Sequence, residues 1–126
     1  MIVGLGIDVV ETARIARVHS RYGARFAARI LTDEEMAATA RRDPVATLAK
    51  YFCVKEAAGK ALGTGIFGPV HWHHIVVTHR PSGRPELHFT DAAAIRFAKL
   101  GGVRCFVSIT DEKNIAAAVV VLEGEG

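Results

Sequence analysis

The residues of this chain best suited to chemistry are two carboxylates and a lysine. Asp8 interrupts the apolar run of residues 2–10, where an ionised carboxylate is costly unless it is paired or bound to a metal. Glu56 and Lys60 are four residues apart, so they share a face if their segment is helical. Carboxylates from two elements can hold a hard cation such as Mg²⁺. A solvated Glu–Lys pair and a turn-capping aspartate have the same spacing, so spacing alone leaves both interpretations open.

Lysines and glycines around this pair extend the pattern toward phosphate. Lys50 and Lys55 precede Glu56, and a Gly63-Thr64-Gly65 turn follows Lys60. Ammonium groups and a glycine-rich helix end both suit phosphate oxygens. The turn is not a P-loop, because in a P-loop the lysine follows most of the loop. The cluster is therefore a candidate metal and phosphate site of another kind.

Periodicity places these residues on a small set of elements. Residues 2–10 predict a strand, in which Gly4 and Gly6 either weaken the strand or permit close backbone approach. A long helix is predicted over residues 45–62, ending at the glycine turn. Further helices are predicted at 12–21, after Gly23, from Thr32 and at 91–100, with strands at 75–78, 86–89, 103–110 and 115–122. The predicted fold class is α+β, one small domain over residues 1–126 with a mainly antiparallel sheet packed on helices.

Composition excludes several classes of protein. The 126 residues are 50% hydrophobic, enough for one domain with a core. Cys53 and Cys105 lie in apolar runs without metal-ligand spacing, which favours a reduced, cytoplasmic protein. The first residues lack the basic start of a secretory signal. No apolar run approaches the ~20 residues of a membrane span, so no membrane association is expected.

The positive charge is concentrated in one segment. Residues 1–31 carry five arginines against two acidic residues and so account for the whole net charge of +3, which suggests an acidic partner. The arginines follow a helical spacing, beside an apolar stripe predicted to face the core. A solvated face is the alternative interpretation. The arginines are Arg14, Arg17, Arg21, Arg25 and Arg29, and the stripe is Ile15, Tyr22, Phe26 and Ile30.

Two motifs resemble those of the holo-acyl-carrier-protein synthases, a family of 4′-phosphopantetheinyl transferases. Gly4-Leu-Gly-Ile-Asp-Val-Val-Glu11, followed by Arg14-Ile15, is similar to the family's opening motif. The segment from Leu48 to Ile66, with its Phe52, Lys-Glu-Ala, Lys-Ala and Gly-Thr-Gly, is similar to the second motif. Arg29-Ile-Leu-Thr32, Gly83-Arg-Pro85 and Val107-Ser-Ile109 follow in family order, so the resemblance covers nearly the whole chain.

The resemblance implies transfer of 4′-phosphopantetheine from coenzyme A to a serine of a small acidic acyl carrier protein, with release of adenosine 3′,5′-bisphosphate, in support of fatty acid biosynthesis. It implies that Asp8 and Glu56 bind Mg²⁺ and that Asp8, Glu56 and Lys60 are catalytic. It also implies a homotrimer with active sites between protomers. The implied coenzyme A contacts are Lys50, Lys55, Lys60, Gly63, Gly65, Arg84 and Pro85.

The same resemblance implies a role for the arginine segment. Relatives use arginines in this region, with an apolar residue at the place of Phe26, to dock the acidic helix of the carrier protein. The matching positions here are Arg14, Arg21, Arg25 and Phe26, and periodicity adds Arg17. The resemblance therefore implies one docking surface made by the first two helical segments.

Several residues depart from the family pattern or suggest other functions. Many relatives have arginine at Tyr51 and histidines at Phe106 and Asp111, so roles of those side chains are not transferred. The alternatives are a relative serving a specialised carrier, a non-catalytic coenzyme A or carrier-binding module, and a nucleic-acid-binding domain. The last is not favoured, because the chain has no recognised nucleic-acid motif. The histidines of residues 71–74 are not expected to bind metal, because neighbouring residues of a strand point to opposite faces.

Overall fold

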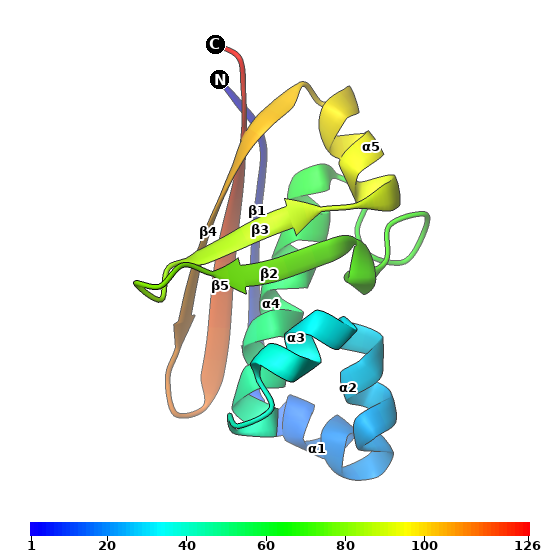
Figure 1. Cartoon of the computed structure of the whole chain (residues 1–126), viewed down its shortest axis with the longest axis vertical. Helices are drawn as coiled ribbons and strands as arrows, with labels where there is room; N and C mark the ends of the chain where they lie inside the picture. The colour runs from blue at the N-terminus through cyan, green and yellow to red at the C-terminus, as the bar shows by residue number, and fades with distance from the viewer.

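The computed structural model describes all 126 residues, with the helices and a separate hairpin on one side of a three-stranded antiparallel sheet (Figure 1). The elements, in chain order, are β1 (Ile2–Glu11), α1 (Thr12–Tyr22), α2 (Ala24–Ile30), α3 (Asp33–Ala38), α4 (Pro44–Leu62), the 3-10 turn η1 (Trp72–His74), β2 (Ile75–His79), β3 (Pro85–Phe89), α5 (Asp91–Lys99), β4 (Gly102–Asp111) and β5 (Ile115–Gly124).

The sheet topology confirms the predicted α+β class. β1, β5 and β4 form a three-stranded antiparallel sheet in the order β1-β5-β4, so β1 and β4 are its edges. β2 and β3 pair separately as an antiparallel hairpin. The short charged turn of residues 112–114 joins β4 to β5, where the sequence predicts a hairpin turn. The 3-10 turn before β2 was not predicted.

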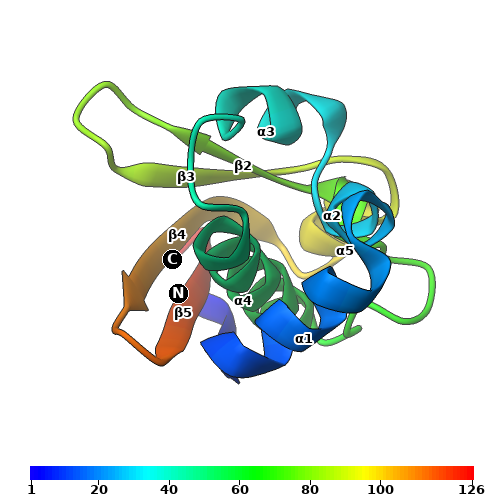
Figure 2. The ribbon, with the colours of Figure 1, turned by 90° about the horizontal axis from the view of Figure 1, so that it is seen from below.

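Helix α4 is the centre of the molecule (Figure 2). Pro44 occupies its first turn, where the missing N–H costs nothing, and Gly63 ends it in the left-handed conformation. Most of its side chains are buried, so it is apolar around most of its circumference rather than amphipathic. It packs against β1 and β5 on one side and reaches the β2–β3 hairpin on another. A functional side chain of α4 can therefore reach solvent only where the surrounding strands and helices leave the helix uncovered.

Two glycines of β1 let that strand lie directly on α4. A Cβ on Gly6 would stand 1.9 Å from the carbonyl oxygen of Ala57, and a Cβ on Gly4 would stand 2.2 Å from that of Ala61. Real Cβ atoms never come so close to backbone, so only glycine permits this packing. Of the two predicted roles for these glycines, close backbone approach is therefore the one that the structure shows.

The alternation of β1 divides its residues between two surfaces. Gly4, Gly6, Asp8 and Val10 share the face that packs on α4. Leu5, Ile7 and Val9 are on the opposite face and are 64%, 61% and 57% exposed. No helix covers this outer face of the sheet (Figure 1). The strand thus carries Asp8 inward and leaves an apolar surface outside.

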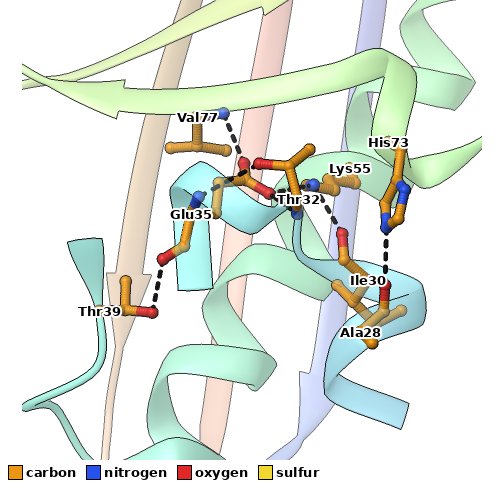
Figure 3. Close-up of polar contacts among 8 residues, drawn as sticks. All are labelled: Ala28, Ile30, Thr32, Glu35, Thr39, Lys55, His73 and Val77. Atoms are coloured by element: carbon orange, nitrogen blue, oxygen red, sulfur yellow. Dashed lines mark hydrogen bonds and ion pairs between the residues drawn. The ribbon is translucent and has the colours of Figure 1, made fainter. Parts of the chain in front are cut away.

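A buried ion pair ties α3 to α4. Thr32 and Glu35 form the predicted capping box, with Glu35 N donating to Thr32 Oγ1 at 3.2 Å and Thr32 N donating to Glu35 Oε1 at 2.9 Å. Lys55 Nζ also donates to Glu35 Oε1 at 2.6 Å, and Val77 N donates to Oε2 at 2.7 Å (Figure 3). One carboxylate therefore joins α3, α4 and β2, which is more than the cap that the sequence predicts.

The arginine segment is two helices rather than one. Gly23, with φ 55° and ψ −128°, separates α1 from α2, as the sequence predicts. All five arginines are exposed, while Ile15 and Ile30 are in the core. Tyr22 was predicted to face the core, but it is 49% exposed because it ends α1 at the chain reversal.

The contact between β1 and α4 can be tested by adding one methyl group. Gly6→Ala forces the strand away from the Ala57 carbonyl and should destabilise the fold by about 3 kcal/mol or more. Gly68→Ala is the matched control, since no atom lies within 4 Å of its Cβ position and its φ is ordinary. Chemical denaturation would compare the two variants. Equal stabilities would show that the close packing is absent in solution.

Candidate active site

Asp8 and Lys60 meet at the edge of the sheet. Lys60 Nζ donates to Asp8 Oδ1 at 3.1 Å and to the carbonyl oxygen of Ile7 at 3.0 Å. The side chain of Asp8 is only 16% exposed, whereas that of Lys60 is 55% exposed. The structure thus brings together two of the predicted catalytic residues, 52 positions apart in the chain. The ammonium is accessible to a ligand, and the carboxylate lies behind it.

Glu56 lies one helical turn before Lys60 on the same side of α4. Its Oε2 accepts a hydrogen bond from the indole Nε1 of Trp72 at 3.1 Å. Burial raises the pKa of Glu56 above its ordinary value, and the charge of Asp8 raises it further. The Trp72 hydrogen bond and the charges of Lys60 and Arg14 act in the opposite direction. A carboxylate with a raised pKa is suited to accept a proton near neutral pH.

Cys53 lies beneath the two carboxylates. Its Sγ donates to the carbonyl oxygen of Ala116 at 3.3 Å, and the side chain is fully buried. Burial raises the pKa of this thiol to about 12, and repulsion from Asp8 contributes next. Cys53 is therefore a buried, protonated thiol beneath the site and is not a nucleophile.

The two carboxylates fit a magnesium ion. The charges of both carboxylates raise the pKa of the Cys53 thiol, and the charge of Asp8 also raises the pKa of Glu56. A nearby cation relieves such repulsion between carboxylates. No third histidine, cysteine or carboxylate joins them. Mg²⁺ usually takes one or two protein carboxylates and completes its shell with substrate phosphates and water, so two are sufficient.

Two groups of residues predicted to contact coenzyme A have structural roles in the fold. Lys55 is fully buried, and its Nζ donates to Glu35 and, at 2.7 Å, to the carbonyl oxygen of Ile30. It has no access to a ligand, so this prediction is corrected. The backbone N–H groups of Gly63 and Gly65 donate to carbonyls of the last turn of α4. These glycines close the helix, and their amides are not available to phosphate.

A second site, a pocket of about 470 Å³, lies between α4, the β2–β3 turn and the end of β4. Arg42, Lys50 and Arg80 give it a positive lining, and His79 adds an imidazole. Lys50 and Pro85 were predicted ligand contacts and do line this pocket, whereas Arg84 is exposed beside it and is not part of the lining. Arg42, His79 and Arg80 were missed, because only folding brings the chain before α4 next to the hairpin.

The helices α1 and α2 carry the arginines to the rim of the first site. Arg14 lies over the ring of Phe52 at 5.8 Å, and Arg29 lies over Trp72 at 5.8 Å. A pocket of about 450 Å³ between these helices and Trp72 is lined by Val18, Tyr22, Arg25, Phe26, Arg29, Phe67 and Trp72. This lining combines apolar side chains with the two guanidinium groups of Arg25 and Arg29, which suits an amphipathic acidic helix.

The histidines of residues 71–74 bond within the protein. The segment is the 3-10 turn η1 rather than a strand, so the strand alternation used in the sequence analysis does not apply. His73 Nε2 lies 2.7 Å from the carbonyl oxygen of Ala28, and His71 N donates to His74 Nδ1 at 3.2 Å. These contacts fix the turn that presents Trp72 to Glu56 (Figure 3 shows the His73 contact).

A carboxylate pair beside a lysine, on a fold with a separate cationic pocket, is an arrangement suited to metal-assisted transfer of a phosphate ester. Comparison with known families agrees. Residues 4–120 match the family model described as the 4′-phosphopantetheinyl transferase superfamily, and the chain belongs to this family. The family resemblance seen in the sequence motifs is thereby confirmed.

Individual relatives match along nearly their whole length. A holo-[acyl-carrier-protein] synthase of Shewanella frigidimarina is 48% identical over 123 residues, which are 97% of this chain and 98% of that protein. The crystal structure of the holo-[acyl-carrier-protein] synthase from Neisseria meningitidis superposes with a TM-score of 0.90 at 40% identity, covering 98% of this chain and 99% of the other. That of the Bacillus anthracis enzyme, in complex with CoA (3′,5′-ADP), gives 0.83 at 33% identity, with 99% of each chain covered.

The raised pKa of Cys53 predicts an unreactive thiol. With a pKa of about 12, roughly one thiol in ten thousand is ionised at pH 8. Native protein treated with iodoacetamide at pH 8 should therefore keep Cys53 unmodified, whereas protein unfolded in guanidinium should be alkylated there. Peptide mass mapping would measure both. Rapid alkylation of Cys53 in the native protein would contradict the burial described here.

Proposed function

We propose that this chain transfers the 4′-phosphopantetheine group of coenzyme A to a serine of an apo-acyl carrier protein. The products are the holo-carrier and adenosine 3′,5′-bisphosphate. The observation that carries the proposal is the meeting of Asp8, Glu56 and Lys60 at one exposed edge of a phosphopantetheinyl transferase fold. The relatives named as holo-[acyl-carrier-protein] synthases support the same reaction. The proposed setting is fatty acid biosynthesis in the cytoplasm, and none of the helices has the length and hydropathy to cross a membrane.

The chemistry follows from the residues. The serine hydroxyl attacks the phosphorus nearest pantetheine, and the bond from that phosphorus to the bridging pyrophosphate oxygen breaks. Glu56, directly or through a water, accepts the serine proton. Lys60 neutralises the negative charge that grows on the leaving phosphate oxygens. Attack and departure require positioning and charge neutralisation more than covalent help from the protein.

Magnesium would be held by Asp8 and Glu56. When bound, it would supply neutralisation and polarisation of the pyrophosphate oxygens. Lys60, which pairs with Asp8 in this structure, would then be free to contact phosphate. The three residues therefore form one unit in which the carboxylates attract cations and the lysine attracts the substrate anion.

The cationic pocket is the proposed place for the adenosine 3′-phosphate. Arg42, Lys50 and Arg80 line it, and Arg80 also pairs with Glu86 at 3.0 Å. Tyr51, where many relatives have arginine, lies in the same lining. Lys50 is the immediate neighbour in sequence, which supports its replacing the absent guanidinium. Arg84 is kept as a proposed contact at the mouth, since its neighbours Gly83 and Pro85 line the pocket.

The two sites lie on opposite sides of one chain, which supports active sites between protomers. Tyr51 and Lys60 are nine residues apart, about two and a half turns of α4, so they point in opposite directions. Asp111 of β4 lines the cationic pocket, whereas Asp8 of the carboxylate site is on β1. These two strands are the opposite edges of the sheet. A ring in which the β1 edge of one protomer meets the β4 edge of the next would complete each site.

The outer face of the sheet gives such a ring an apolar surface to bury. Leu5, Ile7 and Val9 are all more than half exposed, and Phe106 of β4 is 42% exposed. A contiguous apolar surface of this kind usually marks an interface. We therefore propose that the chain forms the homotrimer implied by the family resemblance, with the outer sheet face buried between protomers.

The carrier protein is proposed to dock on α1 and α2. Arg14, Arg17, Arg21 and Arg25 are exposed there, and Phe26 lines the adjoining pocket. Arg25, Phe26 and Trp72 share that pocket, so a docked carrier would lie next to the residue that contacts Glu56. An acidic helix would be attracted by the arginines and would place its serine toward the carboxylates.

The reaction can be tested by incubating the chain with apo-carrier, coenzyme A and Mg²⁺ and weighing the carrier. We expect a gain of one phosphopantetheine. Glu56→Gln should lower kcat by about 10² or more, because it removes both a metal ligand and the proton acceptor. Glu34→Gln, an exposed carboxylate of α3, is the control and should retain activity. An unmodified carrier would rule out the proposed transfer, and full activity in Glu56→Gln would rule out its site.

Docking can be tested by charge reversal. Arg21→Glu should raise the KM for the carrier by about tenfold with little change in coenzyme A affinity, because a like charge repels the acidic helix. The effect should shrink as salt rises, since exposed charges are screened beyond about 10 Å at 0.1 M. Arg41→Glu makes the same charge change outside the docking surface and serves as the control. Equal carrier KM values in the two variants would place docking elsewhere.

Sites shared between protomers can be tested by subunit exchange. Glu56→Gln and the double variant Arg42→Glu, Lys50→Glu damage opposite halves of the proposed site, so each should be inactive alone. Randomly mixed in equal amounts, they should regain about a quarter of the wild-type activity, because that fraction of interfaces joins two intact halves. Activity measured after unfolding and refolding the mixture would show this. No recovery in a mixture that forms mixed trimers would contradict a shared site.

A further inference from the structure

Trp72 makes the one hydrogen bond that the structure gives to the side chain of Glu56. The indole Nε1 donates to Oε2 at 3.1 Å, and both side chains are half-buried. An indole N–H is a donor only, so it can bind the carboxylate but cannot compete with it for a cation. With Oε2 occupied in this way, Oε1 has no protein partner.

The turn that carries Trp72 is held on both sides. His74 N donates to the carbonyl oxygen of His71 at 3.0 Å, closing the 3-10 turn, and His71 N donates to the ring of His74 at 3.2 Å. His73 Nε2 lies 2.7 Å from the carbonyl oxygen of Ala28 at the end of α2. His71, His73 and His74 have no role in the proposed reaction itself. Their contacts fix the backbone of the turn from which the Trp72 indole projects.

Neighbouring groups also fix the indole ring. Its centroid lies 6.3 Å from that of Phe52 and 5.6 Å from that of Phe67, which meets it edge-on. The guanidinium of Arg29 lies 5.8 Å from the ring centre. These contacts hold the ring plane and so determine where the N–H points. A phenyl ring at this position would keep most of this packing but would lack the donor.

We propose that Trp72 is a positioning residue for the proposed transferase reaction. It holds the Glu56 carboxylate through Oε2 and leaves Oε1 for Mg²⁺. Outer hydrogen bonds of this kind orient metal-binding side chains, and their loss typically weakens metal binding by about 10- to 100-fold. The inference rests on the proposed function, because Glu56 binds the metal only in that account.

The contact itself can be tested without metal. Trp72 is the only tryptophan of the chain, so ¹⁵N-labelled protein gives one indole N–H signal in the NMR spectrum. In wild-type protein this proton should resonate downfield and exchange slowly with water. Glu56→Ala should move it upfield and accelerate its exchange, whereas Glu34→Ala should leave it unchanged. An indole signal whose chemical shift and exchange rate are the same in wild type and Glu56→Ala would overturn the proposal.

The positioning role is tested by metal affinity. Mg²⁺ is titrated by calorimetry into each variant saturated with coenzyme A. Trp72→Phe should weaken Mg²⁺ binding by about tenfold or more, with thermal unfolding confirming that the variant is folded. Phe67→Leu removes one of the contacts that hold the indole ring but keeps the donor, so it should weaken Mg²⁺ binding less than Trp72→Phe does.

The same measurements separate this inference from the proposed function. In a Glu56→Ala background, Trp72→Phe should have no further effect on Mg²⁺ binding, because the two residues act through one carboxylate. Wild-type affinity in Trp72→Phe, in an enzyme that still modifies the carrier, would overturn the role of Trp72 alone. Failure of wild-type protein to modify the carrier would instead overturn the proposed function, whatever the indole signal shows.

Discussion

The contact between the backbone of β1 and the backbone of α4 is the constraint on which the site depends. Gly4 and Gly6 let the strand lie against the helix carbonyls of Ala61 and Ala57, with no side chain between. Two residues further along the same face of the strand is Asp8. The close approach therefore brings this carboxylate within reach of Lys60 and close to Glu56. A side chain at Gly6 would lift the strand and separate the charges that the chemistry requires.

A second constraint fixes α4 from its other side. The Glu35–Lys55 pair is fully buried, and the carboxylate also accepts N–H groups from Thr32 and Val77. A buried pair with all its hydrogen bonds made is weak evidence for stability, but breaking it by removing one partner is strongly destabilising. Lys55 and Glu56 are adjacent in sequence and point to different sides of α4. Lys55 holds α4 in place, whereas Glu56 belongs to the candidate active site at the surface.

Much of this could be predicted from sequence because the signals are local. The capping box at Thr32, the break at Gly23 and the glycine end of α4 are each set by neighbouring residues. The role of Lys55 could not be predicted, because its position beside Glu56 resembles a ligand contact and only the packing of α3 shows its partner. Trp72 was missed for a similar reason, since nothing near residue 72 in the sequence indicates that its indole meets Glu56. The cationic lining of Arg42 and Arg80 likewise depends on distant segments meeting.

The most direct test of the account is a crystal structure of the protein with coenzyme A and Mn²⁺, whose anomalous scattering locates the metal. The account predicts one metal peak bound by Asp8 and Glu56 of one protomer. It also predicts that the adenosine 3′-phosphate of the same coenzyme A lies beside Lys50 of a neighbouring protomer. A metal bound away from Asp8 and Glu56, or a coenzyme A molecule held entirely by one protomer, would contradict it.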